Sequence, residues 1–383
     1  MPQGPGEFLE LIRSGEAATR GELLSATGMS RVSVALRVDA LLEAGITRPA
    51  GHAGATGGRR AVRFVFDPPT LVLVAALDLD SGLIAAVDAH GSVMRRRTLD
   101  LNVADGAEAT IRTITQGFTQ LLEECGKDPR LVLAMGISLP APIDPITGRP
   151  EEPPIMPGWD GWPVTEALQE YLDVPVYMEN DADAMAYGEW SHRHGDPTRP
   201  LLLVKVADYI GGGIVIDGRV YRGVDGGAGD LGHIPVGGDK VCRCGRRGCL
   251  ASEASGRAVL EQLSEQQYPV TTFAELNFAL EQQDAVATAV VQSAGEKIGR
   301  VLGSVAAMLN PATIVIAGAM QSVPLVSSIR SAVYASALPR ATRRLEISAS
   351  AVGTDSALIG LARIALDTEY SPAAVNRRLG DSS

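Results

Sequence analysis

The sequence is short of cysteine, of export signals and of uninterrupted apolar stretches. It has four cysteines among 383 residues. The N-terminal region cannot form an apolar signal segment, because it is interrupted by the charged residues Glu7, Glu10 and Arg13. The most apolar long window, residues 301–320, is broken by an Asn-Pro pair, so it predicts a helix end, a turn and a buried strand rather than a membrane span. We therefore expect a cytoplasmic protein with reduced cysteines and no membrane association.

Positive charge is also in deficit, but unevenly. The net charge of −11 argues against nucleic-acid binding by the molecule as a whole. A content of 45% hydrophobic and 21% charged residues is typical of a globular protein, and a length of 383 residues predicts two or three domains. Residues 1–66 nevertheless carry +2, which leaves −13 for the remainder, and residues 29–66 alone carry +4. A basic head on an acidic body indicates an anion-binding module at the N-terminus.

The head has the signals of three short helices. Thr19, followed by Glu22, forms a capping box before the second helix, Gly28 ends that helix, and Ser30 caps the third. This order of helix, glycine-containing turn and helix predicts a helix-turn-helix. Four residues of the third helix fall on one apolar face: Val34, Val38, Leu41 and Leu42.

Residues 46–66 predict two strands joined by a Gly-rich tip that carries two arginines, which is typical of the wing of a winged helix-turn-helix. We expect double-stranded DNA as the partner. The alternative is a small helical dimerisation module with an irregular loop. The candidate DNA-binding residues, at the start of the third helix and in the wing, are Ser30, Arg31, Ser33, Arg37, Arg59 and Arg60.

The rest of the chain predicts an α/β body in which one unit occurs twice. Residues 71–94 and 201–223 share an apolar strand, an Asp-bearing turn with glycine, a second apolar strand and a further turn. This repeat indicates two similar lobes facing a cleft, the architecture of actin-like (RNase H-like) sugar kinases. The expected domains are a winged helix-turn-helix at 1–66, a first lobe at 67–190, and a second lobe at 191–383 whose C-terminal helix packs back on the first lobe.

Three of the four cysteines lie within eight residues, in the stretch C-R-C-G-R-R-G-C. Cys242, Cys244 and Cys249 are open to three interpretations: a redox cluster, a disulfide with a spare thiol, or three ligands of a metal. The expected reducing environment argues against the disulfide.

Several stretches resemble the repressor–open-reading-frame–kinase (ROK) family along essentially the whole chain. They are "PGWDGWP" (157–163), "ENDADA" (179–184), "IGGGIVIDG" (210–218), "GDLGH" (229–233) and "CRCGRRGC" (242–249). The family joins sugar kinases to winged-helix repressors that share the same body.

The resemblance implies one structural zinc ion per chain, held by His233, Cys242, Cys244 and Cys249. The chemistry agrees, because a Cys₃His set closes a tetrahedral zinc site and leaves no position for water. The resemblance also implies that the second ring nitrogen of the histidine faces a sugar. It makes Asp181 the former catalytic base.

The two phosphate-binding turns of the family kinases are altered. Residues 78–82 read D-L-D-S-G where the kinases have D-x-G-G-T, and residues 207–209 read A-D-Y where they have G-T-G. Each acidic side chain placed against phosphate costs on the order of 1 kcal/mol or more. We therefore expect no ATP binding and no enzyme activity.

The sugar side departs from the family as well, because Asp230 replaces a glutamate and Ala251 replaces another, with Glu253 two residues later. The candidate ligand-binding residues are Asn180, Asp181, Asp230, His233 and Glu253. The sequence thus predicts a transcriptional repressor that senses a sugar or other small polar ligand and binds a pseudo-palindromic operator as a homodimer or tetramer. The alternatives are a sugar kinase with a fused DNA-binding head and a ligand-independent DNA-binding dimer.

Overall fold

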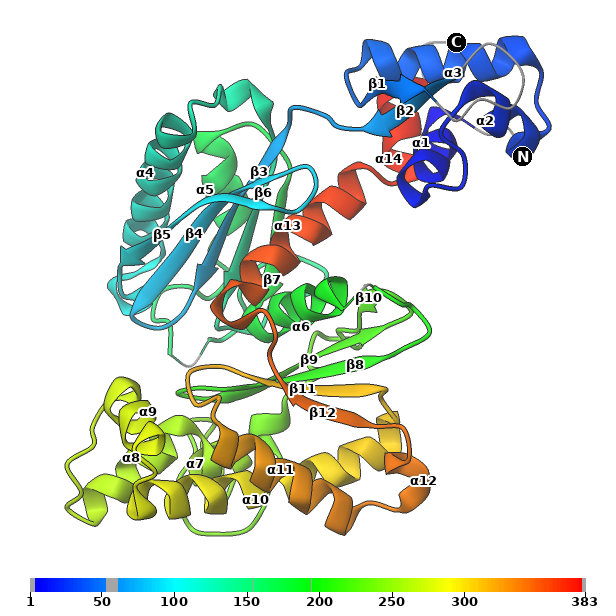
Figure 1. Ribbon diagram of the computed structural model, residues 1–383. Helices are drawn as coiled ribbons and strands as arrows, with labels where there is room; N and C mark the ends of the chain where they lie inside the picture. The colour runs from blue at the N-terminus through cyan, green and yellow to red at the C-terminus, as the bar shows by residue number, and fades with distance from the viewer. Residues whose placement is uncertain (1–3, 53–60, 154, 194, 381–383) are drawn as a thin grey trace.

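The computed structural model describes residues 4–52, 61–153, 155–193 and 195–380. Figure 1 shows a small head, coloured blue, beside two larger α/β lobes that lie one above the other. Within the described part of the chain, no helix is long and apolar enough to cross a membrane.

The head consists of three helices and a two-stranded antiparallel sheet: α1 (Pro5–Ser14), α2 (Arg20–Thr27), α3 (Arg31–Glu43), β1 (Thr47–His52) and β2 (Val62–Phe66). The capping signals are confirmed. The Thr19 side chain accepts a hydrogen bond from Glu22 N, Ser30 accepts one from Ser33 N, and Gly28 adopts φ 67° at the end of α2. The tip that was expected to carry Arg59 and Arg60 lies outside the described residues.

The head core is formed by apolar side chains of all three helices and of β2. Leu42, which was expected in this core, is half-buried, whereas the other three residues of its predicted face are buried. The largest buried members of the head core are Phe8, Leu9, Ile12, Leu23, Leu41 and Phe64.

The first lobe is built on a five-stranded sheet of order β5-β4-β3-β6-β7, in which β3 runs parallel to β6 and antiparallel to β4. Helices α4 and α5 cover its outer face (Figure 1). The elements are β3 (Leu71–Leu77), β4 (Ser81–Asp88), β5 (Val93–Asp100), η1 (Val103–Asp105), α4 (Ala107–Cys125), η2 (Pro129–Leu131), β6 (Val132–Leu139), α5 (Val164–Tyr171) and β7 (Val176–Asn180).

The second lobe repeats this arrangement. Its sheet has the order β10-β9-β8-β11-β12, with β8 parallel to β11 and antiparallel to β9. The identical order and directions confirm the repeat seen in the sequence. The elements are β8 (Leu201–Val206), β9 (Ile210–Ile216), β10 (Arg219–Val220), η3 (Leu231–His233), α7 (Leu250–Ala254), α8 (Gly256–Glu265), α9 (Phe273–Glu281), α10 (Ala285–Leu309), β11 (Thr313–Ala317), α11 (Val323–Ser336), α12 (Pro339–Thr342) and β12 (Glu346–Ala349).

Two helices lie between the sheets: α6 (Asp181–His192) packs on β8 and β9, and α13 (Ser356–Glu369), which follows η4 (Gly353–Asp355), packs on β3 and β6. They cross in close contact, because a Cβ on Gly188 would lie 1.9 Å from Ser356 O and one on Gly360 would lie 1.8 Å from Ala184 O. Only glycine permits this approach of two backbones.

The chain does not end on the first lobe. Beyond α13, helix α14 (Pro372–Gly380) packs against α1 of the head (Figure 1). Asn376 joins the two helices: its Oδ1 accepts a 2.7 Å hydrogen bond from Gly6 N, and its Nδ2 donates one of 2.9 Å to Glu7 Oε2. The expected return of the C-terminal region to the first lobe is thus made by α13, whereas α14 completes the head.

Candidate ligand pocket and metal centre

A cavity of about 690 Å³ lies between the two lobes. Its polar residues follow strand ends: Asp78 comes after β3, Asn180 ends β7, and Asp208 comes shortly after β8. Because the carboxyl ends of parallel strands meet at one edge of a sheet, each lobe delivers these residues to the cleft. The cavity is thus the place where the chemistry of both lobes meets.

The start of α6 lines one side of the cavity. Asn180 caps this helix, since its side-chain oxygen accepts a 2.9 Å hydrogen bond from Ala182 N, while its Nδ2 donates to Ala141 O at 3.0 Å. The neighbouring Asp181 is largely buried, with 14% of its side chain exposed. Both residues were expected to face a ligand, and both line the cavity.

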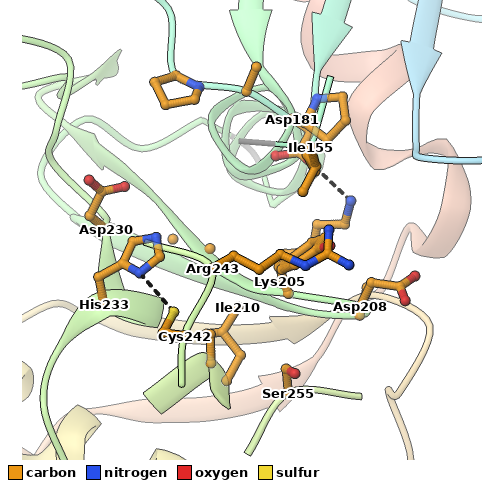
Figure 2. Close-up of a pocket in the computed structure, with 18 of the residues that line it drawn as sticks. Ile155, Asp181, Lys205, Asp208, Ile210, Asp230, His233, Cys242, Arg243 and Ser255 are labelled. Atoms are coloured by element: carbon orange, nitrogen blue, oxygen red, sulfur yellow. Dashed lines mark hydrogen bonds and ion pairs between the residues drawn. The ribbon is translucent and has the colours of Figure 1, made fainter. Parts of the chain in front are cut away.

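A buried lysine, which the sequence analysis overlooked, binds Asp181. Lys205 Nζ lies 2.6 Å from Asp181 Oδ2 (Figure 2). It also lies 3.4 Å from Asp78 Oδ2. Burial alone would lower the pKa of Lys205, but the charges of Asp181 and Asp78 outweigh burial and hold the pKa above its usual value. The ammonium thus joins Asp181, the expected base, to Asp78 of the first expected phosphate turn. The sequence feature that could have revealed Lys205 is its position as a single charged residue within the apolar strand L-L-L-V-K-V.

The second altered turn, residues 207–209, is occupied by bulky polar side chains. Arg257 binds Asp208 at 3.2 Å, and the Tyr209 ring lies beneath two guanidinium groups, those of Arg243 at 5.2 Å and Arg257 at 5.8 Å from its centroid. Burial raises the pKa of Asp208, an effect that the positive charge of Arg257 partly offsets. A carboxylate, a phenol and two arginines therefore line the turn where the family kinases have small residues.

On the opposite side of the cavity, Asp230 lies directly before η3 and His233 ends it, and both line the cavity as expected. Gly229 fixes the loop before η3: it adopts φ 100°, and a Cβ there would lie 2.0 Å from Gly212 O on β9. Glu253 is placed differently, because it is not among the lining residues. Its carboxylate binds Lys297 of α10 at 3.2 Å, so it braces α7 against α10 rather than facing a ligand.

Asp183 is a second lining residue that the sequence analysis overlooked. It is 5% exposed, and its Oδ1 has no hydrogen-bond partner among the described residues. Burial raises its pKa to about 8, with a further contribution from Glu179 that Arg222 partly offsets. Glu179 itself is bound by Arg222 at 3.1 Å, so the Asp183 carboxyl lies beside an ion pair whose acidic member is buried.

His233, Cys242, Cys244 and Cys249 come together as one cluster whose ligand atoms all lie within 4.8 Å of one another. Cys242 Sγ is 3.6 Å from His233 Nδ1, and Cys244 Sγ is 3.7 Å from Cys249 Sγ. Tetrahedral zinc, with Zn–S of about 2.3 Å and Zn–N of about 2.0 Å, places two sulfurs about 3.8 Å apart and sulfur and nitrogen about 3.5 Å apart.

The donor set therefore fits zinc in both composition and spacing. Burial and the neighbouring thiols raise the pKa of Cys249 to about 12, so ionisation of this thiol needs a cation close to its sulfur. Since Nδ1 of His233 faces Cys242, the other ring nitrogen is left for the cavity, as Figure 2 shows.

The candidate DNA-binding residues of the head that the structure describes lie at the start of α3. Ser30 is engaged as the helix cap. Arg31 is exposed, and Arg37 donates a 3.1 Å hydrogen bond to Ser33 O. Asp39 on the same helix is neutralised by an ion pair with Arg20.

Sequence comparison finds relatives of two kinds. The chain is 25% identical over 370 residues to the xylose repressor of Bacillus subtilis (strain 168), covering 94% of both chains. It is 24% identical over 356 residues to the DNA-binding transcriptional dual regulator NagC of Escherichia coli (strain K12), covering 89% of this chain and 86% of NagC. It is 28% identical over 295 residues to a glucokinase of Halalkalibacterium halodurans, covering 72% of this chain and 89% of the glucokinase.

The solved structures that resemble this chain also include both transcriptional regulators and sugar kinases. A ROK family transcriptional regulator, described as a homologue of the E. coli MLC protein, superimposes with a TM-score of 0.82 at 22% identity over 99% of this chain and 98% of that one. A ROK family glucokinase from Streptomyces griseus superimposes with a TM-score of 0.67 at 22% identity over 77% of this chain and 98% of that one. The ROK family sequence profile matches residues 80–368, so this chain is a member of the ROK family.

Proposed function

We propose that this protein is a DNA-binding transcriptional repressor whose ROK body senses a sugar or another small polar ligand. The observation that carries this proposal is the extent of the similarity. The match to the xylose repressor covers 94% of this chain, whereas the match to the glucokinase covers 72%. The additional part includes the head, whose α2-turn-α3 unit and β-hairpin have the form of a winged helix-turn-helix.

We assign residues 1–66 to the DNA-binding domain, 67–190 to the first lobe and 191–383 to the second, from which α13 returns to the sheet of the first lobe and α14 to the head. The body carries −13, so attraction to DNA has to come from the head. Two heads held by a body dimer would double the number of phosphate contacts. A homodimer or tetramer on a pseudo-palindromic operator, with half-sites about one helical turn or a multiple apart, follows from this.

The body has lost sugar kinase activity in this proposal. A general base must accept the proton of the sugar hydroxyl at hydrogen-bond distance. In this chain Oδ2 of Asp181 already accepts from Lys205 at 2.6 Å, so a buried ammonium stabilises the ionised carboxylate and lowers its tendency to take a proton from a sugar hydroxyl. At the phosphate end, Asp208 and Tyr209 fill the altered turn and are held by Arg257.

Zinc would be structural, one ion per chain, bound by the three cysteines and His233. A metal that fixes one ring nitrogen of a histidine also fixes the orientation of the other. His233 would then offer an immobile polar contact to the ligand, beside Asp230 and opposite Asn180. Loss of the metal would therefore weaken ligand binding as well as folding.

A direct route connects this pocket to the head. Asn180 and Asp181 begin α6, α6 crosses α13 at Gly188 and Gly360, and α13 leads into α14, which packs on α1. A ligand changes DNA affinity only if it binds two arrangements of the body unequally. The tight helix crossing would carry a shift of α6 to the head as a rigid displacement.

Two experiments test the proposal with the full-length zinc-loaded protein. Selection from a random duplex library should enrich a two-fold related sequence. A melting screen against sugars, sugar phosphates and nucleotides should find a ligand that changes the affinity for that duplex. Saturable ATP-Mg²⁺ binding with sugar-dependent ADP release would instead establish the kinase alternative. An enriched duplex whose affinity no tested ligand alters would favour the ligand-independent dimer.

A further inference from the structure

The outward face of α3 is apolar at its centre. Val32 and Leu36 are exposed by 70% and 65%. They lie one helical turn apart, on the side of the helix opposite the buried residues Val34, Val38 and Leu41. Exposed single apolar residues are common, but two neighbours at i and i+4 form a small continuous patch. Folding of the head gives no reason for this patch, because neither side chain reaches its core.

The surroundings of this α3 patch, Val32 and Leu36, are cationic. Arg31 is exposed beside it, and Asp39 on the same helix is paired with Arg20. The segment 29–66 carries +4 overall. An apolar patch within positive surroundings is complementary to a surface that is polyanionic at its edges and has apolar points between them. The major groove of duplex DNA has this character, since each thymine presents a methyl group between the phosphate strands.

We propose that Val32 and Leu36 read thymine methyl groups in the major groove, and this inference rests on the proposed DNA-binding function. It changes the assignment of base readers, because the sequence pointed only to polar side chains. Four residues of helix correspond to about 6 Å, and a base-pair step is about 3.4 Å along the duplex. Each half-site should therefore contain two thymine methyl groups about two base-pair steps apart.

The test starts from the duplex that the full-length protein enriches from a random library. Each thymine of that duplex is replaced singly by deoxyuridine, which removes the methyl group and leaves all hydrogen-bonding groups unchanged. Affinities are measured by competition at fixed salt for the wild type, Val32→Ala and Leu36→Ala. Val323→Ala and Leu338→Ala are matched controls, because these residues are 80% and 73% exposed and belong to the second lobe.

Wild-type affinity should fall about fourfold at each contacted thymine, the factor expected for one buried methyl group. Val32→Ala should lose its response to deoxyuridine at one of the two positions and Leu36→Ala at the other, whereas the controls respond as wild type does. Folding is not at risk, because alanine favours an exposed helix position.

Three results would overturn the inference. If a sequence is enriched but no deoxyuridine substitution weakens binding, the proposed repressor function stands and methyl readout does not. If Val32→Ala and Leu36→Ala change the oligomeric state instead of the response to deoxyuridine, the patch is a contact between copies of the chain. If no sequence is enriched at all, the proposed function fails and this inference fails with it.

Discussion

Replacing Asp183 by asparagine should make the stability of the protein less dependent on pH. Burial raises the pKa of this carboxyl from 3.8 to about 8. In the folded chain the group therefore stays protonated up to about pH 8, whereas in the unfolded chain it ionises near pH 4. The unfolded state then binds fewer protons between these limits, so the free energy of unfolding falls as the pH rises.

The size of the effect follows from the same shift. Each pH unit within this window costs about 1.4 kcal/mol. Between pH 5 and pH 7 the wild type should therefore lose about 3 kcal/mol more than Asp183→Asn, which keeps the shape of the side chain but cannot ionise. Glu179 and Arg222 are present in both proteins, so only the part of their titration that depends on the charge of Asp183 enters the comparison.

Urea unfolding of both proteins at pH 5, 6, 7 and 8, with zinc present, measures this difference. Asp173→Asn, at an exposed aspartate of the same lobe, controls for the loss of one negative charge. Parallel profiles of wild type and Asp183→Asn would refute the reasoning, because they would mean that the buried carboxyl is ionised in the folded state.

Four further changes have defined outcomes. Lys205→Met should destabilise the body by about 3 kcal/mol by leaving two carboxylates unpaired, and adding Asp181→Asn should recover part of that loss in denaturant unfolding. Cys249→Ser should lower both the zinc content, which is expected to be one ion per chain and is measured by metal analysis, and the melting temperature. A zinc-free chain that folds fully would contradict the structural role of the metal. Gly360→Ala should lower the free energy of unfolding by about 1–3 kcal/mol through overpacking and should reduce any effect of ligand on DNA affinity. An unchanged ligand response would mean that the crossing of α6 and α13 does not connect the cavity to the head. Arg31→Ala should cost about 1–3 kcal/mol and relax base preference at one position, and equal loss on all duplexes would make it a phosphate contact.

The parts of the fold that the sequence predicted are those governed by local rules. The capping box at Thr19 and the cap at Ser30 depend on residues within one helical turn. The repeated sheet was visible because both halves use the same order of apolar strands and turns. The three cysteines were conspicuous because they lie close together along the chain, but their interpretation as metal ligands, with His233 as the fourth, came from the family resemblance.

The overlooked features all depend on contacts between distant segments. Lys205 binds Asp78, which lies 127 residues away, and no local pattern shows which carboxylates a strand lysine will meet. Glu253 was assigned to the ligand because Ala251, two residues earlier, replaces a glutamate of the family, yet the partner of Glu253 is Lys297 on another helix. Asp183 was not singled out, because no local pattern shows that its side chain is buried beside Ile214 of β9 and Arg222.

The contact between α14 and α1 has a consequence for how the head folds. Gly6 and Asn376 are 370 residues apart, so one wall of the head comes from a helix that is distant in the sequence. A fragment that stops before Pro372 has the three N-terminal helices but lacks α14, which packs on α1. We therefore expect the isolated segment 4–66 to be less stable than the same segment in a chain that includes α14.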